Sequence, residues 1–138
     1  MGILTRFKDI MSANINALLD KAENPEKMID QYLRNLENDL ASVKAETASV
    51  IAEEKAAKRK LDDCNEEIAK MGEYAKRAVA AGNDDEARQF LSKKAELTGR
   101  LEVLQKQYDL CADSAEKMRA MHDKLQTDIV SLKNKRDT

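Results

Sequence analysis

The chain has 138 residues, of which 36% are charged and 4% aromatic; it has no Trp, and its formal net charge is −2. So few aromatic side chains exclude a thick globular core, and the interleaved, nearly balanced charges argue against nucleic acid as a partner. About half of the residues are Ala, Glu, Lys, Leu or Arg, a composition typical of long helices and coiled coils.

The first predicted element is a short amphipathic helix at residues 1–22. At about 100° per residue, its apolar side chains cover one side of the helix and its polar side chains the other. Such a face suits the surface of an anionic membrane. The alternative is that the face packs on the rest of the chain or on a neighbouring protomer. The apolar side comprises Ile3, Leu4, Phe7, Ile10, Met11, Ile15, Leu18 and Leu19.

Membrane attachment through this helix is expected to be weak for one copy. Half-immersing its large apolar side chains contributes on the order of 8 kcal/mol, which the cost of ordering the segment largely offsets. Arg6 and Lys8 add a small attraction to anionic lipid. Stable attachment therefore calls for many copies acting together.

Residues 23–26 form the predicted linker and the cap of the next helix. Asn24 can cap a helix that begins with Pro25, whose missing N–H is not needed there, and Glu26 suits the positive end of the helix dipole.

Residues 27–138 carry two apolar seams with 3–4 spacing, one from Ile29 to Ala78 and the other from Ala87 to Leu132. A tight turn is predicted between them, near residues 81–85, with Gly82 and Asn83 at its tip. The fold class that follows is all-α: a long antiparallel two-helix coiled-coil hairpin preceded by the short amphipathic helix.

No catalytic, cofactor or metal site is expected. A two-helix hairpin has no deep, dry pocket for acid–base chemistry, Cys64 and Cys111 are far apart in sequence, and His122 is the single histidine. No apolar run approaches the roughly 20 residues that span a bilayer, and charged residues interrupt the start where a signal peptide is apolar. We therefore expect a non-enzymatic, cytoplasmic protein.

Three stretches of this sequence resemble the phage-shock-protein A family, which contains the vesicle-inducing protein of plastids and is similar to ESCRT-III proteins. The resemblance covers the whole chain, and its most specific part is NINALLDKAENPEKMI at Asn14 to Ile29. The stretches are MGILTRFKDIMSANINALLDKAENPEKMIDQYLRNLENDL, AETASVIAEEKAAKRKL and AGNDDEARQFLSKKAEL.

The resemblance implies a peripheral protein of the envelope stress response that maintains, protects or remodels the inner membrane from its inner face. It also implies assembly into rings, rods or filaments, and family members usually continue into further helices used in polymerisation. The residues that would insert into the membrane are Ile3, Leu4, Phe7, Ile10, Met11, Ile15 and Leu18. Two alternatives remain open: a module that binds and inhibits a AAA+ transcription activator, and a soluble coiled-coil scaffold.

Overall fold

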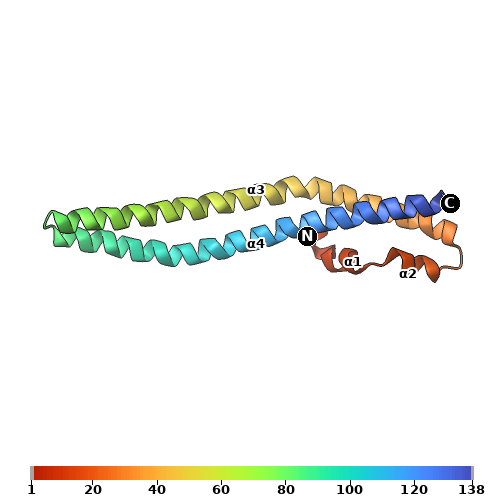
Figure 1. Ribbon diagram of the computed structural model, residues 1–138, viewed down its shortest axis with the longest axis horizontal. Helices are drawn as coiled ribbons and strands as arrows, with labels where there is room; N and C mark the ends of the chain where they lie inside the picture. Colours follow the sequence, from red (N-terminus) through yellow and green to blue (C-terminus); the bar gives the residue numbers. More distant parts are fainter. Residues whose placement is uncertain (1, 138) are drawn as a thin grey trace. The chain divides into compact units, whose positions relative to one another are not determined.

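The computed structural model describes residues 2–137, so Met1 and Thr138, at the ends of the predicted segments, lie outside it. All regular elements in this range are helical. They are η1 (Ile3–Arg6, a 3₁₀ helix), α1 (Phe7–Ser12), α2 (Ile15–Asp20), α3 (Pro25–Ala80) and α4 (Asp84–Arg136). The predicted all-α hairpin is confirmed, because α4 follows α3 after a short turn and packs against it (Figure 1).

The start of α3 shows why a new helix begins at Pro25. The Oδ1 atom of Asn24 accepts the backbone N–H of Lys27 at 3.3 Å, and the Asn24 carbonyl accepts the N–H of Met28 at 3.2 Å. Pro25 then occupies the first helical position, where no backbone donor is needed. This cap separates α3 from the residues before it.

The turn between α3 and α4 consists of Ala81, Gly82 and Asn83. The N–H of Asn83 donates to the carbonyl of Ala78 at 2.8 Å, and the N–H of Gly82 donates to the carbonyl of Val79 at 3.0 Å. This pair of bonds is a Schellman motif, which needs a left-handed residue at its centre. Gly82 supplies it with φ of +78°.

The chain divides into two compact units, and the second is Ala52–Ala112. Its buried side chains lie on the predicted 3–4 seams, and many are alanines, which let two helices approach closely. They are Leu61, Cys64, Ala75 and Ala78 of α3, and Ala87 and Leu97 of α4.

The first unit combines Met1–Ile51 with Asp113–Thr138 and holds two larger clusters of buried side chains. The Ile10 cluster consists of Ile3, Ile10, Val43, Met118, Met121 and Leu125. The Leu19 cluster consists of Ile15, Leu19, Ile29, Leu33, Ile129 and Leu132. Each cluster joins the N-terminal segment to α3 and α4, so the base of the hairpin is a three-layered core.

The third layer changes which residues of α4 are buried. Met121 is completely buried although it lies outside the predicted seam, because it joins Ile3 and Ile10 in the Ile10 cluster. His122 lies on the same 3–4 spacing as the buried Met118 and Leu125, yet 35% of its side chain is exposed. The seams derived for two helices still predict most of the buried positions here, such as Val43 and Met118, but they miss the burial that a third element adds at Met121.

Candidate membrane-binding segment

The N-terminal segment, defined here as residues 2–20, differs from the single continuous helix expected from the sequence. It is interrupted after α1, where Ala13 and Asn14 adopt extended backbone conformations. The Asn14 side chain then caps α2, its Oδ1 accepting the N–H of Ala17 at 3.0 Å. Asn favours caps over helix interiors because its side chain competes for nearby backbone groups. The segment is therefore two short helices and a 3₁₀ turn.

Most of the side chains predicted to bind membrane face the hairpin in this conformation. Ile3, Ile10 and Ile15 are buried, with 5–7% of their surface exposed. Leu4, Phe7 and Met11 are half-buried against the Ile10 cluster. The apolar face of the segment thus packs on the rest of the chain, which was the alternative to membrane binding in the sequence analysis.

Three of the predicted residues remain accessible. Leu18 is 41% exposed and Lys8 is exposed, while Arg6 keeps 51% of its side chain in contact with solvent. The docked conformation therefore offers a membrane two bases and one large apolar side chain. Membrane binding by the full set stays a prediction, and it requires the segment to leave the hairpin.

Two acidic residues of α3 hold the beginning of the segment. Glu46 Oε2 accepts the backbone N–H of Ile3 at 2.7 Å. Asp39 Oδ1 accepts a hydrogen bond from Arg6 Nη1 and forms an ion pair with it, and only 14% of the Asp39 side chain is exposed. Charge-assisted bonds such as these are stronger than neutral ones.

Two lysines of α4 hold the segment from the other side. Lys124 Nζ donates to the carbonyl of Ala13 at 2.9 Å, where the backbone between α1 and α2 has no helical partner, and it also pairs with Asp128. Lys117 Nζ lies 5.3 Å from the centroid of the Phe7 ring, a cation–π distance. Both long helices thus contribute charged groups to docking.

The sequence did not identify these holding residues. Asp39 and Glu46 are seven positions apart and so share one face of α3, but solvated acids at this spacing are common on helices. Lys124 lies 111 residues from the carbonyl that it binds. Only the tertiary contact distinguishes these side chains from ordinary surface charges.

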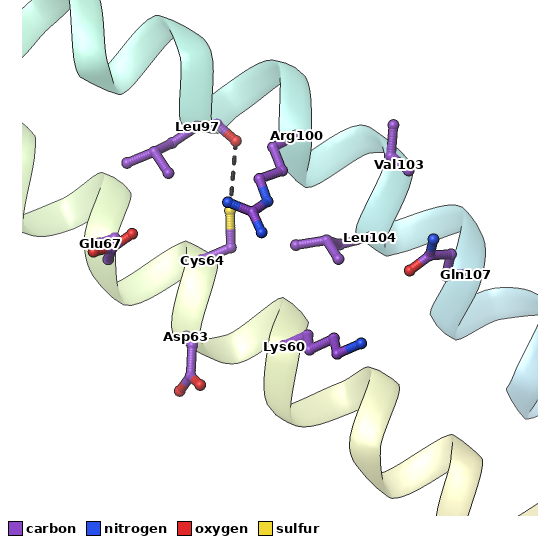
Figure 2. Close-up of a pocket in the computed structure, with 9 residues that line it drawn as sticks. All are labelled: Lys60, Asp63, Cys64, Glu67, Leu97, Arg100, Val103, Leu104 and Gln107. Atoms are coloured by element: carbon purple, nitrogen blue, oxygen red, sulfur yellow. Dashed lines mark hydrogen bonds between the residues drawn. The ribbon is translucent and has the colours of Figure 1, made fainter.

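The second unit contains a shallow space of about 480 Å³ between α3 and α4 (Figure 2). Its buried Cys64 donates its S–H to the carbonyl of Leu97 at 3.4 Å. Its lining side chains mix two bases and two acids with apolar and amide groups. They are Lys60, Asp63, Cys64, Glu67, Leu97, Arg100, Val103, Leu104 and Gln107. Opposite charges in so open a space suit a solvated helix face and form no nucleophile–base pair.

The remaining expectations concern metal ions and membrane-spanning helices. No three His, Cys, Asp or Glu side chains within residues 2–137 are placed to hold a metal ion. None of the helices described there is both long and apolar enough to cross a bilayer. The absence of cofactors and of enzymatic activity stays a prediction.

The fold and the segment together define a class: helical hairpins that carry an amphipathic N-terminal segment docked on their base. The model of the PspA/IM30 family matches residues 2–138, and the chain belongs to this family. The predicted relationship to phage shock protein A is thereby confirmed.

Curated relatives support the same assignment. The chain is 56% identical over 137 residues to the phage shock protein A homolog of Bacillus subtilis (strain 168), covering 99% of this chain and 60% of that protein. It is 31% identical to the membrane-associated protein Vipp1 of Nostoc punctiforme, covering 99% of this chain and 53% of the relative. It is also 30% identical to protein LiaH of B. subtilis, covering 90% and 57% respectively. The chain thus spans at most about three fifths of the length of these relatives.

Proposed function

We propose that this chain is a peripheral, non-enzymatic membrane-binding protein of the envelope stress response, whose assembled hairpins maintain, protect or remodel the inner membrane. The N-terminal segment is the membrane contact. One related protein, Vipp1 of Nostoc punctiforme, is named a membrane-associated protein, which favours this assignment within the PspA/IM30 family.

The observation that carries the proposal is that a short, mostly exposed connection joins the amphipathic segment to the hairpin. Lys21–Asn24 connect α2 to α3, and three of these four residues are exposed. Apart from the segment, α3 and α4 have a contact of their own in the second unit, where Cys64 donates its S–H to the carbonyl of Leu97. The segment can therefore swing away as one piece while the hairpin persists.

Release of the segment exposes apolar surface on both sides of the contact. Val43 and Leu125, now fully buried, become accessible, and the apolar face of the segment becomes accessible with them. The released state is thus a minor one in water, and it becomes favourable where a bilayer accepts that face. Anionic lipids attract Arg6 and Lys8 to the same surface.

Assembly would supply the multiple copies that weak attachment requires. Val103 and Leu110 of α4 are 55% and 70% exposed, and their spacing of seven residues places them on one face of the helix. An exposed apolar pair on a charged helix favours contact with another hairpin. Homo-oligomers of this kind raise the effective affinity for a membrane without any new lipid contact.

Flotation with vesicles of equal phosphatidylcholine and phosphatidylglycerol tests the membrane contact. Leu18→Asp removes an apolar side chain of the segment that is already exposed in the docked state, so it spares the core. We expect the lipid concentration for half-maximal binding to rise about tenfold.

Leu91→Asp is the matched control, because Leu91 is 51% exposed and lies on α4, outside the segment. It makes the same chemical change and is expected to leave vesicle binding within twofold of the unsubstituted chain. Equal flotation of the Leu18→Asp chain and the unsubstituted chain would refute the proposed role of the segment in membrane binding.

A further inference from the structure

The docked segment and the membrane-bound segment use the same chemical groups. Ile3 and Ile10 are packed in the Ile10 cluster, and Arg6 is paired with Asp39. These are the side chains that a bilayer would need for apolar insertion and for attraction to lipid phosphates. One copy of the segment therefore cannot satisfy both partners at once.

The acidic pair on α3 occupies the place that lipid headgroups would take. Glu46 binds the backbone N–H of Ile3 in the first turn of the segment, and Asp39 binds the nearest base of the segment, Arg6. Phosphate oxygens accept hydrogen bonds from backbone amides and from guanidinium groups in the same way. The negatively charged phosphates of an anionic lipid can thus take the place of both carboxylates as acceptors for the Ile3 N–H and for Arg6.

The backbone at Gly2 lies unusually close to one of these carboxylates. A Cβ built on Gly2 would lie 1.9 Å from Glu46 Oε1 and 2.8 Å from Glu46 Cδ. Any other residue at position 2 would force the Glu46 side chain to move away. The clashing atoms are the end of a flexible side chain, so a Cβ at position 2 shifts the Glu46 carboxylate and perturbs its contact with Ile3 without changing any charge.

We propose that Asp39 and Glu46 hold the N-terminal segment closed on the hairpin, and that an anionic membrane surface opens it by competing for the groups these carboxylates bind. The inference rests on the proposed function in that the segment is the membrane contact. It adds that affinity for the membrane is set by the strength of an internal contact.

The size of the effect follows from the fraction of open molecules. The apparent affinity for a membrane equals the intrinsic affinity multiplied by that fraction, so a weaker closed state gives tighter binding. Replacing a charged acceptor by a neutral amide is expected to raise the open fraction about fivefold where the closed state dominates. Glu46→Gln and Asp39→Asn make this change with almost no change in shape.

Hydrogen–deuterium exchange of residues 3–20 in the full chain without lipid tests the closed state by itself. We expect exchange there to accelerate about fivefold in Glu46→Gln and in Asp39→Asn, and to accelerate less in Gly2→Ala, which only shifts the Glu46 carboxylate. Glu53→Gln, an exposed acid of α3, is the matched control and should leave exchange unchanged. Unchanged exchange of residues 3–20 in all three test variants would overturn the proposal.

Flotation of the same chains with equal phosphatidylcholine and phosphatidylglycerol tests the competition. Half-maximal binding is expected at about fivefold less lipid for Glu46→Gln than for Glu53→Gln. Suppose that Leu18→Asp weakens flotation, as the proposed function requires. If Glu46→Gln then exchanges faster but does not bind vesicles more tightly, competition between the carboxylates and lipid is refuted. If Leu18→Asp leaves flotation unchanged, the proposed function is refuted instead. The exchange experiment without lipid still decides whether the carboxylates hold the segment closed.

Discussion

The docking of the N-terminal segment makes a quantitative prediction about two residues that are 111 positions apart. Ile10 and Met121 are 5% and 0% exposed, and both belong to the Ile10 cluster. Replacing either by Ala removes buried methyl and methylene groups and leaves a cavity, which costs about 2–5 kcal/mol when the surroundings do not collapse. Since Ile10→Ala also weakens docking, it should reduce the cost of Met121→Ala in the same chain.

A double-mutant cycle measures this coupling. We expect the double variant to be less destabilised than the sum of the single variants by about 0.5–3 kcal/mol, the range for residues that share a core cluster. The assay is urea denaturation of each full chain, followed by circular dichroism, with the free energy of unfolding obtained by linear extrapolation.

The control cycle pairs Ile10→Ala with Leu61→Ala. Leu61 is 4% exposed and belongs to the second unit, so it has a comparable burial but no place in the Ile10 cluster. This pair should add within about 0.5 kcal/mol. Additivity of Ile10 with Met121 as well would refute the docking of the segment over α4.

Two further predictions concern the hairpin. Gly82→Ala should lower the free energy of unfolding by about 1 kcal/mol, because φ of +78° strains a residue with a Cβ. Gly99→Ala should raise the free energy of unfolding by about 0.5–1 kcal/mol, because Gly99 lies inside α4 with open space around it. Urea denaturation checks both signs, and a stabilising Gly82→Ala would contradict the Schellman turn. Replacing Val103 and Leu110 together by Glu should shift sedimentation velocity profiles toward smaller species, with Ser92→Glu as the control. Identical profiles would exclude this face of α4 from assembly.

Much of the hairpin is predictable from sequence because its signals are local and repeated. The 3–4 spacing predicts the buried positions of the second unit, such as Leu61, Cys64 and Leu97. A glycine followed by Asn83 in an otherwise unbroken helical pattern indicates where the chain turns. Each of these features is visible within a few neighbouring residues.

The candidate site is less predictable because its partners are distant in sequence. The apolar periodicity of the segment is correct for Ile3, Ile10 and Ile15, but periodicity says only that a face needs an apolar partner and not which partner it has. The break between α1 and α2 has a local signal in the sequence, because Asn14 is a preferred cap residue. The apolar pattern continues across the break, however, and so predicts one helix.

The sequence by itself determined the family, the helical hairpin and the presence of an amphipathic N-terminal segment. Tertiary structure decided that this segment lies against α3 and α4 and that Met121 is buried beneath it. It also decided that Asp39, Glu46 and Lys124 hold the segment there. The physical reason is that burial of apolar surface is non-directional, so the apolar face alone does not specify whether lipid or protein covers it. The charged contacts are directional, and they exist only once the distant helices are in place.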